Sequence, residues 1–291
     1  MSPDAPGSVF QGEARTVAAL WPAKVAELTA EARVRRALPR AGLRRIGPFV
    51  FCDHFGPVPA KPESMGIPAH PHVGLQTVTY LFSGESRHTD SLGSDQIIRP
   101  GDVNWMTGGS GIVHAEEVLP GPGELHGMQT WVGLPQAHRR IAPAFAHFSS
   151  VVLPRLEFAG ARVRVVAGRV GEAASPVPTF QPLTYLDVEL EPGATLHLPV
   201  EAAQSLGVYV AVGELEISAQ RVDSGVLAHL SESSPLLVLS SKAGARAIVL
   251  GGEPLPEPTV IWWNFVVDSV AEGKALQADW EAGRFPSIPG S

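Results

Sequence analysis

Apolar residues along this chain occur in many short runs separated by turn residues, which is the pattern of an all-β protein. Residues 76–82 (QTVTYLF) and 103–106 (VNWM) are rich in β-branched and aromatic side chains, and each run is bounded by a turn containing glycine. Glycine and proline number 30 and 27 among 291 residues. No low-complexity run explains that high content, whereas many short strands joined by tight turns would.

A second series of strand-like runs fills the other half of the chain. They are residues 163–167, 183–190, 207–212, 215–217 and 235–239. In residues 183–190 apolar and polar side chains alternate, so one face of that strand is expected to be buried. We therefore predict two β-barrels in tandem. The expected order is a loose N-terminal tail over 1–22, a first barrel over 23–135, a connector over 136–152 and a second barrel over 153–291.

One helix is expected close to the C-terminus. Ser269 is followed three residues later by Glu272, which is the spacing of a capping box. Leu276 and Trp280 share one helical face, and Gly283 suits the C-terminal cap. These signals predict a short helix over residues 270–282 that packs on a barrel and ends the second domain.

Charge and cysteine content exclude some classes of protein. The formal net charge is −7, so we expect no direct binding to nucleic acid by charge. Cys52 is the one cysteine, which rules out an intrachain disulfide and fits a reducing compartment. No run approaches the roughly 18 apolar residues that a membrane helix needs, and no cationic region precedes a signal-like stretch. We expect a cytoplasmic protein that is a monomer and has no contact with membranes.

Two pairs of residues with ligand-type side chains supply the candidate chemistry. His70 and His72 stand two apart, as do His114 and Glu116. Residues i and i+2 of a strand share a face, so each pair can direct two ligand atoms to one point. A lone His-x-His pair is more often structural or on the surface, and the second pair is what favours a metal. Three imidazoles and a carboxylate suit iron, manganese, nickel, copper or zinc, and leave positions open for substrate.

The chain resembles the pirin family of the cupin superfamily across most of residues 47–135. The matching runs are 47–57 (GPFVFCDHFGP), 70–72 (HPH), 77–81 (TVTYL), 100–107 (PGDVNWMT), 111–116 (GIVHAE) and 126–132 (HGMQTWV). The resemblance implies a bicupin, that is, two jelly-roll barrels in tandem. It also implies one metal ion, usually Fe(II), held by three histidines and one glutamate, which correspond here to His70, His72, His114 and Glu116.

Two departures from the general cupin pattern bear on the ligand set. Gln76 occupies the position of the glutamate that follows the second histidine by four residues, and Val118 occupies the position of a later asparagine. A neutral amide is a poor metal ligand, so Glu116 is the carboxylate candidate, as the pirin arrangement has it. Zinc, manganese, nickel or copper could substitute for iron, because affinity alone does not select a metal.

Further residues are candidates for the substrate pocket or for supporting roles. Gln129 and Trp131 share one face of a strand that begins at His126, and all three are pocket candidates. His54 is a candidate for a partner of a metal ligand, although a structural hydrogen bond is the simpler interpretation. His88, His138 and His147 are expected on the surface, and the second half of the chain is expected to hold no metal.

Two hypotheses about function follow, and the resemblance supports both. In the first, the protein is a quercetin 2,3-dioxygenase-like oxidoreductase that takes a flavonol or related aromatic enol together with O2. Glu116 is the only acid among the predicted ligands and is therefore the candidate general base for the enol proton. In the second, the protein is a metal-dependent regulator, such as a transcriptional cofactor, that binds a protein partner without turnover. Fold alone does not decide between them.

Overall fold

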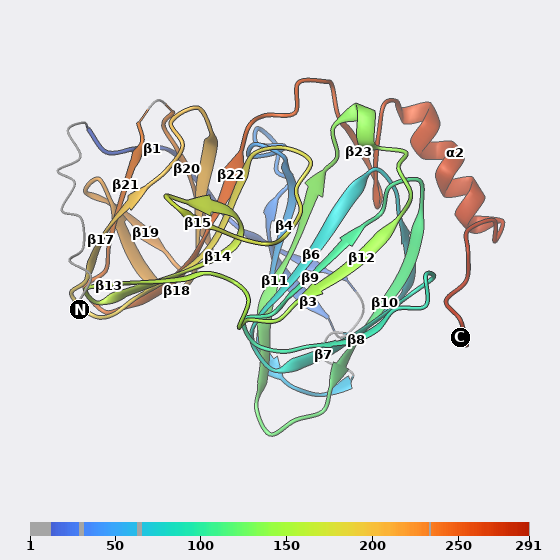
Figure 1. Cartoon of the computed structure of the whole chain (residues 1–291), viewed down its shortest axis with the longest axis horizontal. Coiled ribbons are helices and arrows are strands. Elements are labelled where there is room, and N and C mark those ends of the chain that lie inside the picture. Colours follow the sequence, from blue (N-terminus) through green and yellow to red (C-terminus); the bar gives the residue numbers. More distant parts are fainter. Residues whose placement is uncertain (1–12, 29–31, 63–65, 233, 291) are drawn as a thin grey trace.

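The chain folds into two β-barrels that lie side by side, with a helix on the far side of the first barrel (Figure 1). The computed structural model describes residues 13–28, 32–62, 66–232 and 234–290. Within this part of the chain almost every regular element is an antiparallel strand. The prediction of a mostly β fold with two barrels and a C-terminal helix is therefore confirmed.

The first barrel contains the strands from residue 24 to residue 148. They are β2 (Lys24–Glu27), β3 (Arg33–Leu38), β4 (Phe49–Pro59), β5 (Ile67–His72), β6 (Leu75–Ser83), β7 (Glu85–Asp90), β8 (Asp95–Ile98), β9 (Val103–Thr107), β10 (Ile112–Leu119), β11 (Glu124–Gly133) and β12 (Ala144–Phe148). Seven of these form a sheet in the order β12-β9-β6-β11-β4-β3-β2. The other four form a sheet in the order β5-β10-β7-β8, which contains both predicted ligand pairs.

The second barrel is one eleven-stranded sheet. Its strands are β1 (Val17–Pro22), β13 (Arg155–Phe158), β14 (Ala161–Val170), β15 (Ala173–Ala174), β16 (Leu183–Leu190), β17 (Thr195–Pro199), β18 (Ser205–Ile217), β19 (Gln220–Asp223), β20 (Val226–Leu230), β21 (Leu236–Ser240) and β22 (Ala245–Gly252). The strand expected over 183–190 is β16. The runs expected over 207–212 and 215–217 are one continuous strand, β18, which passes through a β-bulge between Val210 and Val212.

The expected loose tail is only partly a tail. Residues 1–12 lie outside the described residues, but β1 pairs with β20 in the second barrel. Arg15 precedes this strand and is fully buried, and its guanidinium donates to five backbone carbonyls of residues 201–234 at 2.8–3.1 Å. A guanidinium has five donors, so it can satisfy that many acceptors at once. The segment from Arg15 to Pro22 therefore belongs to the second barrel, and the predicted boundary at residue 22 does not hold for it.

The expected connector also contributes to a barrel. Residues 136–138 form a short 3-10 helix, and β12 then pairs along β9 at the edge of the seven-stranded sheet. The pairing places His147 opposite Asn104, whose side-chain oxygen lies 2.8 Å from His147 Nδ1. The prediction of a plain connector over 136–152 was therefore wrong for Ala144–Phe148, where the partner strand lies about 40 residues earlier and leaves no local signal.

The C-terminal segment crosses back to the first barrel. It contains β23 (Val260–Trp262), β24 (Phe265–Val267) and α2 (Val270–Glu281). Phe265 pairs with Val73 of the first barrel, and these two side chains share a buried cluster with Val267, to which Leu276 of α2 adds. The Ser269 hydroxyl accepts from Glu272 N at the helix start, as the capping box predicts. The predicted helix is thus confirmed, but it packs on the first barrel and not on the second.

One apolar core runs across the boundary between the barrels. Strand β6 is buried on both faces, since Val78 and Tyr80 pack toward the second barrel while Leu81 packs inside the first. The Tyr80 hydroxyl donates to Asp187 at 2.8 Å, and the Phe49 and Tyr185 rings lie 5.4 Å apart. Burying aromatic side chains from both barrels in one cluster makes the two halves a single packed unit.

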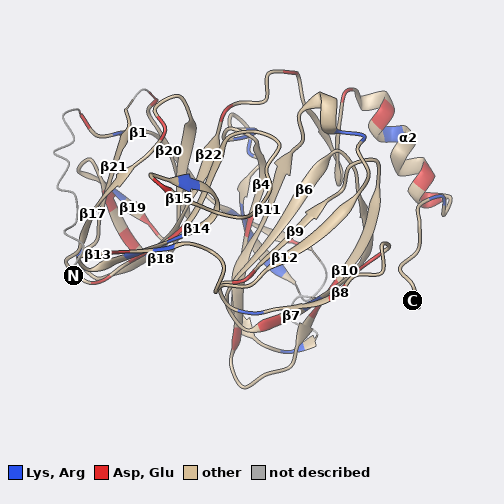
Figure 2. Cartoon of the chain, viewed as in Figure 1, with Lys and Arg blue, Asp and Glu red and all other residues tan. Residues whose placement is uncertain are grey.

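Charged residues are spread over both barrels and α2, and a few of them, such as Arg15 and Asp187, are buried. In Figure 2 acidic and basic residues are interspersed along the second barrel and on α2. Among the described residues, no helix combines the length and apolar character that crossing a bilayer requires.

Replacing Arg15 tests whether the N-terminal segment is part of the second barrel. Arg15→Ala leaves several buried carbonyls without a donor, so we expect the free energy of unfolding to fall by about 2–4 kcal/mol. Arg33→Ala is the matched control, because the Arg33 side chain is two-thirds exposed and its ion pair among the described residues is with exposed Glu27. Thermal and urea denaturation would measure both. Equal stability of the two variants would show that the segment is dispensable.

Candidate metal centre

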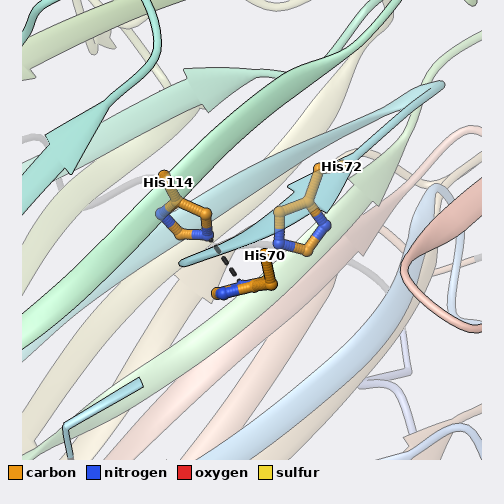
Figure 3. Close-up of side chains that lie close together, drawn as sticks. All are labelled: His70, His72 and His114. Carbon is orange, nitrogen blue, oxygen red and sulfur yellow. Dashed lines mark hydrogen bonds between the residues drawn. The ribbon is translucent and has the colours of Figure 1, made fainter. Parts of the chain in front are cut away.

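The two ligand pairs lie on neighbouring strands of the four-stranded sheet. His70 and His72 end β5, and His114 and Glu116 lie in β10, which runs antiparallel to it. In the register His114 lies opposite His70, so the alternation of strand side chains brings both pairs to one side of the sheet. Figure 3 shows the three imidazoles converging from these strands.

Distances in the cluster match those of ligands around one ion. The nearest ring nitrogens of His70, His72 and His114 all lie within 4.8 Å of one another. The Nε2 atoms of His70 and His114 are 3.0 Å apart (Figure 3). Imidazole nitrogens bind a metal at about 2.0–2.1 Å, and two such ligands at right angles would be roughly 3 Å apart. Ligand atoms of His114, Glu116 and His88 also lie within 4.8 Å of one another.

Hydrogen bonds at the other ring nitrogen fix the protonation of two ligands. His70 Nδ1 lies 2.8 Å from the carbonyl oxygen of Pro68, and His72 Nδ1 lies 3.2 Å from that of Asn264. A carbonyl can only accept, so both Nδ1 atoms carry the hydrogen. In a neutral imidazole the Nε2 atom then has a lone pair and no proton. The cluster thus presents bare nitrogens to one another, which is the tautomer that a metal ion requires.

Burial favours the neutral form of these imidazoles. Desolvation lowers the pKa of His70, and it lowers the pKa values of His72 and His114 well below the usual range. The neighbouring histidines add to the depression for His72 and His114. Neutral nitrogen ligands packed this closely, with a carboxylate beside them, have the chemistry of a divalent transition-metal site.

Glu116 is held in place by the strand that lies across the barrel. The Thr79 hydroxyl of β6 donates to Glu116 Oε1 at 2.7 Å, and the side-chain amide of Gln129 lies 2.9 Å from the same hydroxyl. A hydroxyl has one hydrogen, and the two acceptors beside it are Glu116 Oε1 and Gln129 Oε1, of which the carboxylate oxygen is the nearer. The Thr79 hydroxyl therefore orients the carboxylate.

A cavity of about 620 Å³ adjoins the cluster and is lined by His70, His72 and Glu116. One wall is a stack of rings. The Phe51 and Trp131 rings are nearly parallel with centroids 4.0 Å apart, and the Trp131 and His72 rings meet edge to face with centroids 5.0 Å apart. The guanidinium of Arg36 covers the other face of Phe51 at 4.5 Å, while its nitrogens bind both oxygens of Asp53. The wall is thus flat, aromatic and close to electrically neutral.

The opposite end of the chain contributes to the same cavity. Trp263, Asn264 and Trp280 line it, and they come from the C-terminal segment that packs on the first barrel. Trp263 has a left-handed backbone, with φ at 49°. A bulky residue in that conformation is uncommon, and it is held here between two flanking strands. Sequence patterns gave no indication of this contribution, because the segment lies about 190 residues from the histidines.

The predicted pocket residues separate into two places. Gln129 and Trp131 line the cavity. His126 lies elsewhere, with its Nε2 atom 2.6 Å from that of buried His54. His54 Nδ1 in turn lies 2.9 Å from the hydroxyl of Tyr209 in the second barrel. These two histidines therefore lie at the boundary between the barrels, where burial lowers the pKa of His54 to about 2 and that of His126 to about 4.

His88 departs from its predicted surface position. It is 3% exposed, on β7 beside His114. The prediction treated His88 as a lone residue, whereas Asp90 stands two residues later on the same face of the strand and is also buried. The same spacing rule that identifies the ligand pairs would have identified this one.

Comparison with known proteins places the chain in a family. Residues 31–132 match Pirin, and residues 185–286 match the Pirin C-terminal cupin domain. A "Pirin-like protein" of Caulobacter vibrioides is 42% identical over 260 residues, covering 86% of this chain and 88% of that protein. A "Putative quercetin 2,3-dioxygenase" of Pseudomonas aeruginosa is 38% identical over 262 residues, covering 90% and 82%.

A solved structure agrees with both matches. The crystal structure of a quercetin 2,3-dioxygenase from Acinetobacter baumannii superposes with a TM-score of 0.88 at 33% identity, covering 94% of this chain and 92% of that one. The two family matches occur in the order of the two barrels described above, and the relatives extend over nearly the whole chain. With its two cupin domains and its cluster of histidines in the first, this chain belongs to the pirin family.

Proposed function

We propose that the protein holds one divalent metal ion, iron in the cell, on His70, His72, His114 and Glu116, and that it oxidises flavonols or related enols with O2. The observation that supports this most strongly is the convergence of neutral imidazoles whose Nδ1 hydrogens are already used, so that bare Nε2 atoms of His70 and His72 face the cluster. The names of the Pseudomonas and Acinetobacter relatives point to the substrate class.

The residues of the chain have separable tasks in this proposal. A redox-active metal would supply a Lewis acid for the enol oxygen and a path for electrons between substrate and O2. Glu116 accepts the proton of the enol hydroxyl, and Thr79 keeps the carboxylate turned toward the cluster. The Phe51–Trp131 stack offers a flat apolar face to an aromatic substrate. The cavity volume lies in the range of about 300–1,000 Å³ typical of small-molecule sites.

One observation favours the alternative, a metal-dependent regulator. His72 is hydrogen-bonded by the carbonyl of Asn264, so a ligand of the proposed metal is tied to the segment that leads into α2. A change of metal state at His72 could therefore alter the surface that α2 presents to a protein partner. Turnover is the property that separates the hypotheses.

Metal analysis tests the site itself. Protein stripped by a chelator and reloaded with Fe(II) under argon should hold one ion per chain. His114→Ala should lose most of it, with a loss larger than the roughly 10–100-fold in affinity that removal of an outer partner costs. Gln76→Ala is the control, because Gln76 is buried but donates to Thr107 and lies outside the cavity lining. Full occupancy in His114→Ala, or two ions in the wild type, would contradict the ligand set.

Oxygen uptake tests the reaction and the base. Iron-loaded protein should consume O2 with quercetin, and Glu116→Gln should slow turnover by about 10²–10⁴-fold while some metal remains, since the amide still offers an oxygen but accepts no proton. Glu117→Gln is the matched control, because Glu117 is the next residue along β10 and its side chain is two-thirds exposed. Full activity in Glu116→Gln would remove Glu116 as the base. If metal-replete wild type consumes no O2 with several flavonols and enediols, the regulatory hypothesis becomes the better one.

A further inference from the structure

His88 and Asp90 are buried directly behind the cluster and have no task in the proposed reaction. They lie on β7, the strand next to β10, where Asp90 is opposite His114 and His88 is opposite Glu116. His88 is 3% exposed and Asp90 is fully buried. The His88 ring stacks on Phe145 at 4.3 Å and lies 5.2 Å from the His114 ring. A buried carboxylate and imidazole in this position require an explanation beyond packing.

The hydrogen bonds of Asp90 are directional. Its Oδ1 atom accepts from the backbone N–H groups of Leu92 and Ser94 at 2.9 and 3.0 Å, and its Oδ2 atom lies 3.0 Å from His88 Nε2. Burial alone would raise the pKa of Asp90, but the hydrogen bonds from His88 and Ser94 outweigh it and the pKa lies below its usual value. An ionised carboxylate only accepts, so His88 Nε2 carries a hydrogen.

The hydrogen bond from His88 to Asp90 determines which nitrogen of His88 faces His114 without a hydrogen. With the hydrogen on Nε2, the Nδ1 atom of a neutral His88 has a lone pair, and it lies 3.4 Å from Nδ1 of His114. That contact requires His114 to carry its hydrogen on Nδ1, which leaves Nε2 bare and facing His70.

We infer that Asp90 and His88 are positioning residues that set the tautomer of His114 and so prepare the third imidazole for the metal. The inference rests on the metal site of the proposed function. Pro68 and Asn264 do the same for His70 and His72 through backbone carbonyls. At His114 the partner of Nδ1 among the described residues is His88, and the chain from Asp90 through His88 takes the place of a carbonyl.

We call the hydrogen bonds that run from Asp90 through His88 to His114 the relay. Asp90→Asn is the decisive substitution, because it replaces one carboxylate oxygen by an NH2 group and should reverse the direction of these hydrogen bonds. The amide oxygen will remain on the two backbone N–H groups now bound by Oδ1, so the NH2 group must face His88 Nε2. His88 then accepts at Nε2 and carries its hydrogen on Nδ1. That hydrogen points at His114 Nδ1 and moves the His114 hydrogen to Nε2, the atom that would bind the metal.

Two substitutions at His88 separate the relay from packing. His88→Phe keeps a ring stacked on Phe145 but neither donates nor accepts. His88→Gln keeps the polarity of the neutral imidazole, since its NH2 can donate to Asp90 while its oxygen accepts from His114. Asp102→Asn is the matched control, because Asp102 is a buried carboxylate in the same barrel that accepts backbone N–H groups and faces His147.

Co(II) is the probe for affinity, measured by competition with a chromophoric chelator and by the visible spectrum of the bound ion. We expect Asp90→Asn and His88→Phe to bind Co(II) about 10–100-fold more weakly than wild type with an altered spectrum. The Co(II) affinities of His88→Gln and Asp102→Asn should stay within about threefold of the wild-type affinity. For His88→Gln the reason is that the new amide still donates to Asp90 and still accepts from His114. Affinities of Asp90→Asn and His88→Phe equal to that of the control would overturn the inference, as would two cobalt ions per wild-type chain.

A second readout does not depend on metal. In chelator-treated protein labelled with ¹⁵N at histidine, ring nitrogen shifts should show His114 with its hydrogen on Nδ1 in wild type and on Nε2 in Asp90→Asn. The same tautomer in both proteins would overturn the relay even if metal affinity changed. If wild type binds no Co(II), the proposed metal site fails, while the nitrogen shifts still decide whether the relay exists. Thermal unfolding with chelator present verifies that each variant is folded.

Discussion

The site in the first barrel depends on which ring nitrogen carries the hydrogen in three imidazoles, two of them buried and one half-buried. A neutral imidazole has one N–H and one lone pair, so the partner at Nδ1 determines what Nε2 can do. Carbonyl oxygens of Pro68 and Asn264 fix two of the rings. Burial lowers the pKa of His70, His72 and His114. Protonation of these rings is therefore disfavoured as a way to relieve the repulsion between lone pairs that face one another. A cation at this point would satisfy the arrangement, and the strand register of β5 and β10 makes the convergence possible.

The histidine cluster depends on both halves of the chain, although its proposed metal ligands all belong to the first half. Asn264 holds His72 from 192 residues away, and the strand that follows it pairs with Val73. In the other direction, β1 leaves the N-terminal part of the chain to become an edge strand of the second barrel. Each barrel therefore uses an element from the opposite end of the sequence. With an apolar core continuous between them, neither barrel is expected to keep its structure alone.

Alternation along strands explains both what could be predicted from the sequence and what could not. It places His70 with His72 and His114 with Glu116, and it puts Gln129 and Trp131 on the cavity face while His126 faces the other way. Applied to His88 and Asp90 it would have found the buried pair on β7. It cannot find Asn264, whose backbone carbonyl has no side-chain signature. Nor can it find β1 or β12, whose pairing is decided by distant strands.

The aromatic wall and the C-terminal segment meet at His72, a proposed metal ligand, and this links the two candidate functions. The Trp131 ring lies edge to face with the His72 ring, while Asn264 holds the Nδ1 atom of His72. Trp263 and Trp280 of the same segment line the cavity that an aromatic substrate would enter. A molecule in the cavity therefore contacts the support of a metal ligand as well as the ligand itself. Catalysis and regulation would then both depend on the segment from β23 through α2. They would differ only in whether the bound molecule is converted.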